Sequence, residues 1–309
     1  MIHTTMYTAN TIYLKVAEHV FAIRTDKHDA MLRRMERNYS PFIIPDGGGR
    51  LLFSIDIDRR TTFPAGDPVK TFRYMLASDN AELRIYPDRY LLSILNVRSG
   101  RTFSAVCPME TDCNGQYRFH SDLTIQGIAP PSHILDHLLI FAFSVASVSY
   151  DTLLIHASTI VHDGKAVMFL GESGTGKSTH SRMWLENIPG TSLLNDDAPA
   201  VRAYGDGRVT AFGTPWSGKT PCYKNESYPL AALVRIKRAP YNELSRQSSL
   251  HAFSAVLPSS LPTMQQDERL LDATCAAIST VLSSTPVYVM ECLPDADAAR
   301  TAHKGLFRS

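Results

Sequence analysis

Hydrophobic and polar positions in the first third of the chain follow patterns that favour β-strands. Ile12 to Ile23 and Leu51 to Ile57 show two-residue alternation or short apolar runs, and the charged stretch Lys27 to Arg37 between them predicts a helix. Leu83 to Val97 and Thr102 to Val106 predict two strands joined by a glycine-containing turn. We therefore expect a strand-rich N-terminal domain.

A more continuous apolar stretch follows Pro130-Pro131 and predicts a buried helix with Ser132 as its N-cap. The stretch from Ile134 to Tyr150 contains polar residues, and we expect it to be too short and too polar to span a membrane. We place a domain boundary near residue 128. Residues 1–128 then form the strand-rich domain, which would suit substrate presentation, and residues 129–309 form a second domain.

The second half of the chain begins with a pattern that predicts a hairpin. Leu153 to Val161 and Ala166 to Leu170 are apolar and strand-like, and Asp163-Gly164 between them is a hairpin signal. The second strand leads into a glycine-rich segment and a helix from Lys177 to about Glu186. A tight hairpin makes its two strands antiparallel, whereas doubly wound phosphate-loop enzymes use helical crossovers. We therefore expect an α/β (α+β) domain with a mixed sheet, outside the Rossmann-like group.

The rest of the chain alternates short strands with helices. Strands are predicted at Thr191 to Leu194, Ala200 to Tyr204, Val209 to Phe212 and Pro286 to Cys292, and helices at Gln266 to Leu282 and after Pro294.

The glycine-rich segment Gly171 to Ser178 fits the phosphate-loop pattern G-x-x-x-x-G-K-[ST] at every fixed position. Its glycines let successive backbone amides point inward at phosphate oxygens. Lys177 would supply charge to the β- and γ-phosphates, and the Ser178 hydroxyl would ligate Mg²⁺. The predicted phosphate contacts are Gly171, Glu172, Ser173, Gly174, Thr175, Gly176, Lys177, Ser178 and Thr179.

Two acidic residues, Asp196 and Asp197, end the predicted strand about twenty residues downstream. Carboxylates at this position reach the magnesium ion or the nucleophile in phosphoryl-transfer enzymes. Adjacent residues of a strand point to opposite faces, so one carboxylate would hold the metal and the other would accept a proton. His156, in the strand expected to pair with the loop-entering strand, is a further candidate, although a histidine there can also be a hydrogen-bonded core residue.

These segments together resemble two related families. Ile155-His-Ala-Ser158, Val167 to Ser178 and Leu194-Asn-Asp-Asp197 are similar, in the same order, to segments of bacterial HPr kinase/phosphorylase and of ATP-dependent phosphoenolpyruvate carboxykinase. The resemblance covers roughly residues 150 to 220 and implies a mixed-sheet nucleotide-binding fold of the HPr kinase/carboxykinase type.

The resemblance also implies functional roles for individual residues. Lys177 and Ser178 would contact phosphate and Mg²⁺, Asp197 would be the proton acceptor and a metal ligand with Asp196 as its companion, and His156 would lie at the catalytic centre. ATP and Mg²⁺ are the implied cofactors. HPr kinases form hexamers, so a homo-oligomer is a further implication.

The sequence departs from both families in places. The glycine-rich signature with a metal-binding glutamate is missing, and Glu226 is a poor substitute. The substrate-binding arginines and the metal-ligating lysine of the carboxykinases are not found. Phe212 to Lys219 and the strand after Pro229 instead resemble HPr-kinase-like proteins encoded beside peptide-modification systems. Lys219 either touches a phosphate or an acidic substrate group, or is a solvated turn residue.

The amino-acid composition limits the classes of binding partner and the cellular location that we expect. With 31 basic and 30 acidic residues the formal net charge is +1, which argues against a general nucleic-acid binder. The five cysteines are an odd number without a CxxC pair, and the N-terminus lacks a signal-peptide pattern. We expect free thiols, a cytoplasmic location and no membrane association.

The leading interpretation is an ATP-dependent phosphotransferase that moves the γ-phosphoryl group to a hydroxyl of a protein, a peptide or a small molecule. Two alternatives remain open. One is a nucleotide-binding regulator with little catalysis, favoured by the missing glutamate. The other is a carboxykinase-like enzyme.

Overall fold

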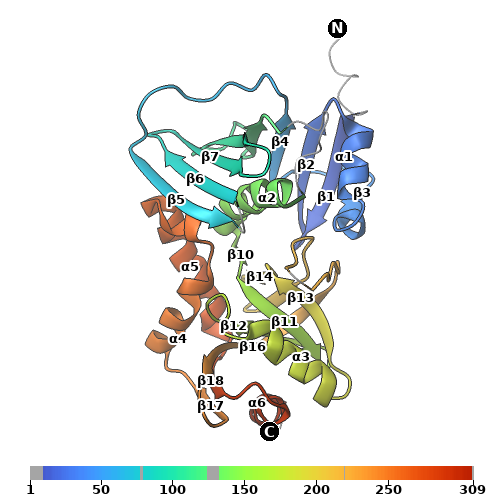
Figure 1. Ribbon diagram of the computed structural model, residues 1–309, viewed down its shortest axis with the longest axis vertical. Coiled ribbons are helices and arrows are strands. Elements are labelled where there is room, and N and C mark those ends of the chain that lie inside the picture. Colours follow the sequence, from blue (N-terminus) through green and yellow to red (C-terminus); the bar gives the residue numbers. More distant parts are fainter. Residues whose placement is uncertain (1–9, 77–78, 124–131, 219, 308–309) are drawn as a thin grey trace. The chain divides into compact units, whose positions relative to one another are not determined.

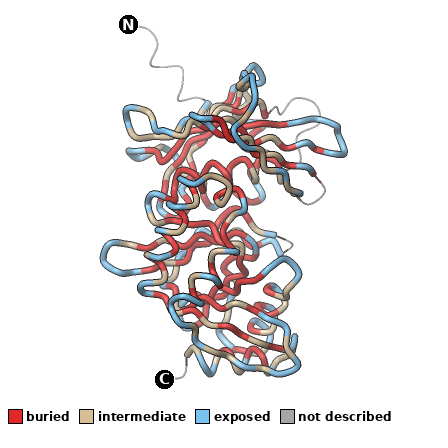
Figure 2. The backbone as a smooth tube through the Cα atoms, turned by 90° about the vertical axis from the view of Figure 1, so that its left-hand side faces the viewer, coloured by how far each residue is buried: buried red, intermediate tan, exposed pale blue. Residues whose placement is uncertain are grey.

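The computed structural model describes residues 10–76, 79–123, 132–218 and 220–307. The chain forms two compact units, residues 1–146 and 147–309. Figure 2 shows that buried residues concentrate on the strands and helices of each unit and exposed residues on the connecting loops.

The first unit contains a nine-stranded sheet, counted over the described residues, with the order β3-β1-β2-β4-β9-β8-β7-β6-β5 (Figure 1). Strand β4 is parallel to β2 and to β9, and the other neighbours are antiparallel. The elements are β1 (Thr11–Val16), β2 (His19–Thr25), α1 (His28–Met35), η2 (Ser40–Phe42), β3 (Ile43–Ile44), β4 (Phe53–Ile57), β5 (Lys70–Leu76), β6 (Asp79–Ile85), β7 (Arg89–Asn96), β8 (Arg101–Pro108), β9 (Tyr117–Ser121) and α2 (Ser132–Ser147).

The strand-rich character predicted for this region is confirmed, but individual strands differ from the prediction. The single strand predicted from Leu83 to Val97 is two strands, β6 and β7, separated at Tyr86–Asp88. Pro87 lies in this turn and donates no backbone hydrogen bond, which suits an interruption between paired strands.

Helix α2 belongs with the first unit rather than with the second unit, to which the predicted boundary assigned it. Its aromatic side chains explain this grouping. Phe143 packs edge-on against Phe21 of β2, with ring centroids 6.2 Å apart, and Phe141 packs against Tyr90 of β7 at 6.4 Å. Residue 128 itself lies outside the described residues.

One helical stretch in the described part of the chain, His133–Tyr150, is long and apolar enough to cross a membrane by length and composition alone. The expectation that this region is too short and too polar was therefore wrong. Within the structure 67% of the stretch is buried. This burial is typical of a core helix.

The second unit contains another nine-stranded sheet among its described residues, built on the order β10-β14-β15-β16-β12-β11-β13, with β18 beside β16 and β17 beside β18. Its strands are β10 (Thr152–Leu154), β11 (Ala157–His162), β12 (Lys165–Leu170), β13 (Ser192–Asp197), β14 (Ala200–Ala203), β15 (Val209–Phe212), β16 (Ser227–Arg238), β17 (Glu243–Arg246) and β18 (Val287–Cys292). Its helices are η3 (Val148–Tyr150), α3 (Lys177–Asn187), α4 (Ser249–Val256), η4 (Leu257–Ser259), η5 (Pro262–Gln265), α5 (Glu268–Ser284) and α6 (Ala296–Phe307).

The mixed sheet predicted from the hairpin is confirmed. Strands β11 and β12 are antiparallel and joined at Asp163 and Gly164, whose φ angles of 47° and 68° are those of a tight primed turn. On its other side β12 is parallel to β16, and β16 is parallel to β18.

The predicted strand from Leu153 to Val161 is wrong in one respect that matters for the site. It breaks at Ile155–His156 into β10, which pairs with β14, and β11, which pairs with β12 and β13. His156 therefore lies in the break before β11 and not inside a strand. Its amide donates to the carbonyl of Ser259 at 2.8 Å.

Helices α3 and α6 pack on one face of this sheet over a hydrophobic cluster that includes Phe169, Trp184 and Val234. Helix α4 packs against β16 and β18, and α5 against β10 and β14; Figure 1 shows both on the other side of the sheet. The first turn of α3 is thereby fixed directly after the end of β12.

Candidate functional site

The predicted phosphate loop connects the end of β12 to the start of α3. Gly171, Gly174 and Gly176 have φ angles of 146°, 81° and 111°, which non-glycine residues rarely adopt. At Gly171 an added Cβ would also lie 2.6 Å from Thr175 Oγ1. Within this fully described segment, the backbone amides of Ser173, Gly174 and Gly176 have no hydrogen-bond partner. Spare amides at a helix N-terminus form a favourable anion site.

Lys177 lies inside this loop and is only 8% exposed. Its Nζ donates to the carbonyl oxygens of Gly171 at 2.8 Å and Glu172 at 3.2 Å. Burial lowers the pKa of Lys177 below its ordinary 10.5, while Asp197 and Asp196 act in the opposite direction. The ammonium group therefore occupies the interior of the loop, and it must exchange these carbonyls for phosphate oxygens if a nucleotide binds.

Ser178 and Asp196, two of the three predicted metal ligands, are brought together, and the third, Asp197, points to the other face of β13. Ser178 Oγ donates to Asp196 Oδ1 at 2.8 Å. A hydroxyl and a carboxylate at this distance match the oxygen ligands that Mg²⁺ takes beside nucleotide phosphates. In the described part of the chain no group of three or more His, Cys, Asp or Glu residues could hold a metal.

Asp197 lies beside His156, with Oδ1 and Nε2 3.7 Å apart. Partial burial, and next the neighbouring Asp196, raises the pKa of Asp197 above its ordinary 3.8, and Lys177 opposes this shift. Burial and then Lys177 lower the pKa of His156 below 6.5, against the influence of Asp196. A carboxylate of raised basicity next to a predominantly neutral imidazole suits proton transfer.

The two carboxylates are positioned by Asn195, which is fully buried at the end of β13. Its Nδ2 donates to the carbonyls of Thr214 and Trp216, at 3.3 and 3.1 Å, and its Oδ1 accepts from the Ala198 amide. This fixes the segment after β15 across the end of β13. The sequence analysis named Asn195 only within the segment Leu194 to Asp197 and gave it no role. Lys219, a candidate on the segment after β15, lies outside the described residues.

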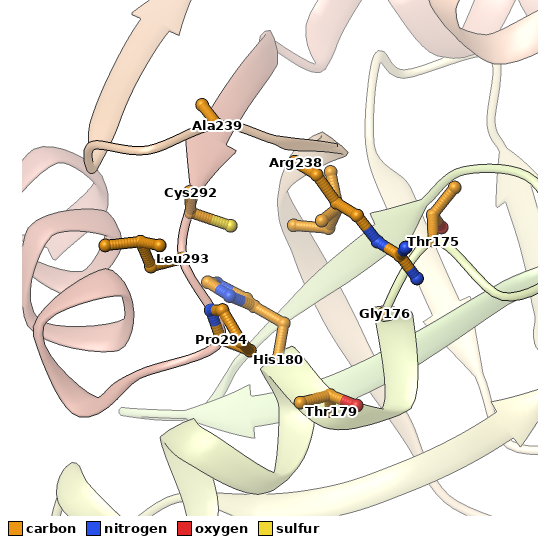
Figure 3. A pocket seen from close by; sticks show the side chains of 10 residues that line it. Thr175, Gly176, Thr179, His180, Arg238, Ala239, Cys292, Leu293 and Pro294 are labelled. Atoms are coloured by element: carbon orange, nitrogen blue, oxygen red, sulfur yellow. The ribbon is translucent and has the colours of Figure 1, made fainter.

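A cavity of about 400 Å³ opens beside the loop on the α3 face of the sheet (Figure 3). Apolar side chains of Ile236, Cys292, Leu293 and Pro294 form part of its wall. Its polar rim includes Thr175, Thr179, His180 and Arg238, and Figure 3 shows the Arg238 side chain extending toward Thr175 and Gly176. The Arg238 Nη2 donates to the carbonyl of Gly174.

His180 presents a defined hydrogen-bonding pattern to this cavity. Burial lowers its pKa to about 4, so the imidazole is neutral near pH 7. Trp184 Nε1, which can only donate, lies 3.3 Å from His180 Nε2. The ring proton is therefore on Nδ1. Thr175, Gly176 and Thr179 of this cavity belong to the predicted phosphate contacts. The sequence analysis missed His180, Ile236, Arg238 and Cys292, because they come from α3, β16 and β18, which only the fold brings together.

Comparisons with known proteins leave the identity open. Neither a scan against protein-family models nor a search of curated proteins finds a match. Among solved structures the chain is similar to the HPr(Ser) kinase/phosphatase from Coxiella burnetii, with 11% identity, a TM-score of 0.30, and coverage of 49% of this chain and 86% of that one. A TM-score this low supports no functional argument, so function must be argued from the site.

Proposed function

We propose that this protein binds a nucleoside triphosphate with Mg²⁺ at Gly171–Thr179 and transfers its γ-phosphoryl group to a hydroxyl. The observation that carries the proposal is the arrangement at the α3 N-terminus. Three partnerless amides and a buried lysine lie in one loop, Ser178 and Asp196 meet at 2.8 Å, and a carboxylate of raised pKa lies next to them. An anion site, a metal site and a base are the components that phosphoryl transfer needs.

Each group has a defined task in this reaction. The loop amides and Lys177 hold the phosphate oxygens, and Ser178 and Asp196 would hold Mg²⁺, which neutralises charge on the β- and γ-phosphates. Asp197 accepts the acceptor hydroxyl's proton as that oxygen bonds to the γ-phosphorus. The bond from γ-phosphorus to the bridging oxygen breaks, and the nucleoside diphosphate leaves. His156 keeps the Asp197 carboxylate oriented.

The cavity beside Thr179 and His180 would hold the nucleoside. Its volume of about 400 Å³ and largely apolar lining are those of small-ligand pockets. The acceptor is a protein, a peptide or a small hydroxyl compound.

The Asp197→Asn variant tests the proposal. We expect calorimetry to show Mg²⁺-dependent ATP binding by the wild type, with an affinity preserved in the variant to within about threefold. ATP turnover, with water or an added acceptor, should fall by about 10²- to 10⁴-fold, the usual contribution of a general base.

Asp163→Asn is the matched control, because this carboxylate is exposed in the β11–β12 turn. It should leave both binding and turnover unchanged. Tight binding without any turnover by the wild type would instead indicate a nucleotide-binding regulator. Oxaloacetate-dependent nucleotide consumption would indicate a carboxykinase-like enzyme, and absence of any nucleotide binding would refute the proposal.

A further inference from the structure

Arg235 of β16 lies beside the phosphate loop although no motif in the sequence marks it. In the parallel pairing of β16 with β12, Arg235 is the register partner of Leu170, the residue directly before Gly171. Its neighbours Val234 and Ile236 belong to the hydrophobic cluster under α3. Because side chains alternate along a strand, Arg235 points to the opposite face of the sheet.

The strand register also places Arg235 in the same cross-strand row as Asp197, the proposed base. Leu170 is paired with Ala157 of β11, and Ala157 is paired with Asp197 of β13. These four residues form one cross-strand row, and directly paired residues share a face. Three strand spacings, about 14 Å between backbones, separate its two ends. Asp197 and the long Arg235 side chain therefore approach the end of β12 from opposite sides.

The guanidinium group of Arg235 has weak partners for a side chain that is only 20% exposed. Nη1 donates to the carbonyl of Ala255 at 3.1 Å, and Nη2 lies 3.8 Å from Glu172 Oε1. Glu172 is 80% exposed, so water screens this ion pair. Among the described residues the guanidinium group of Arg235 has no other polar partner, which leaves most of its five N–H donors unused.

Arg238, three residues further along β16, approaches the loop differently. It borders the cavity on the α3 face and donates to the Gly174 carbonyl. Arg235 is on the other face, with Glu172 and Asp197. The two arginines therefore serve different parts of a bound nucleotide, Arg238 the part in the cavity and Arg235 the end where Asp197 acts.

We propose that Arg235 is a catalytic arginine that contacts the phosphoryl group during its transfer. This inference rests on the proposed function. In the absence of nucleotide, Glu172 and the Ala255 carbonyl hold the guanidinium group. During transfer its planar N–H donors bind the equatorial oxygens of the phosphoryl group, where charge develops. An arginine supplied in this way accelerates phosphoryl transfer strongly.

The test compares Arg235→Ala and Arg235→Lys with the wild type, using ADP, ADP with aluminium fluoride as a transition-state mimic, and ATP turnover. We expect Arg235→Ala to bind ADP within about threefold of the wild type, to lose at least about 100-fold in affinity for the mimic, and to turn over ATP about 10³-fold more slowly. Arg235→Lys should retain no more than about a tenth of the turnover, because lysine lacks the planar fork.

Two control variants and a chemical-rescue experiment separate this role of Arg235 from others. Arg246→Ala removes an exposed arginine of β17 in the same sheet and should change nothing. Arg238→Ala should weaken ADP and the mimic equally. Dissolved guanidinium at millimolar concentration should restore part of the turnover of Arg235→Ala, which a purely structural anchor for α4 would not show, and none of the turnover of Asp197→Asn.

The outcomes distinguish the two proposals. If the wild type binds ADP and the mimic, and both Arg235 variants bind the mimic as tightly as the wild type, the inference is overturned and the proposed function stands. If the wild type binds no nucleotide, both are overturned. Loss of ADP and mimic affinity in equal proportion in the Arg235 variants, without guanidinium rescue, would also overturn the inference.

Discussion

Asp196 and Asp197 are chemically identical neighbours that the fold places in different surroundings. Asp196 is buried and accepts a hydrogen bond from Ser178. The side chain of Asp197 is 49% exposed and lies on the opposite face of β13 from Asp196. On that face it is next to His156. Two carboxylates in different environments differ in pKa and can therefore take different chemical roles.

The Asp197 carboxylate is expected to reduce stability near neutral pH. Because its folded-state pKa is raised, the folded protein binds this proton more tightly than the unfolded chain. The resulting stabilisation is present below the unfolded pKa and is lost as the pH rises through the raised value. We therefore predict that Asp197→Asn raises Tm by about 1–3 °C at pH 7–8, with a smaller difference toward pH 4.5, in scanning calorimetry.

Asp206→Asn is the control, because we expect it to change Tm in the opposite direction. Hydrogen bonds from Arg208 lower the pKa of this exposed turn carboxylate, so its removal should lower Tm slightly at neutral pH. A Tm of Asp197→Asn below that of the wild type at pH 8 would contradict the prediction.

At the scale of elements, α3 determines whether the site is assembled. The helix starts at Lys177 with Gly176 as its N-cap, so its position sets both Lys177 and Ser178. Trp184, one of the largest fully buried side chains, holds it against the sheet. Its indole packs near Phe169 and near Phe307 of α6, with centroid distances of 6.0 Å in both contacts.

Trp184→Ala should therefore cost about 3–5 kcal/mol in the free energy of unfolding, measured by urea denaturation, because it leaves a large cavity between α3 and the sheet. Leu185→Ala on the same helix is the control. Its side chain is 40% exposed, and the change should stay within about 0.5 kcal/mol of the wild type. Equal effects of the two substitutions would show that α3 is not held by this contact.

At the scale of the whole molecule, every residue assigned a role in the candidate site lies in the unit of residues 147–309. That unit has its own nine-stranded sheet, with helices packed against it and a hydrophobic core. It therefore has the features of an independently folding domain.

We predict that a fragment of residues 147–309 binds Mg²⁺-ADP with an affinity within about tenfold of the full chain, measured by calorimetry. A fragment of residues 1–146 should show no binding. Circular dichroism should first establish that each fragment is folded. A folded 147–309 fragment without nucleotide affinity would contradict this prediction.

Much of the local structure could be predicted from the sequence. The Asp163-Gly164 hairpin and the start of α3 agree with the prediction. Glycine and turn residues favour particular backbone angles, and this preference depends on few neighbouring residues. The mixed character of the sheet followed from the hairpin. The break at His156 could not be predicted in this way, since Leu153 to Val161 contains no glycine or proline. The segment is divided because β10 and β11 pair with different strands.

The amino-acid sequence alone determined where a phosphate loop can form, since the glycines of 171–176 permit angles that other residues avoid. It also predicted that Asp196 and Asp197 face opposite sides of a strand. The tertiary structure decided which side chains meet there: β16 pairs with β12 across a long separation in sequence, and this brings Arg235 into the row of Asp197. It also assigned α2 to the first unit. Pairing between distant strands depends on the burial of the whole sheet, which no local pattern encodes.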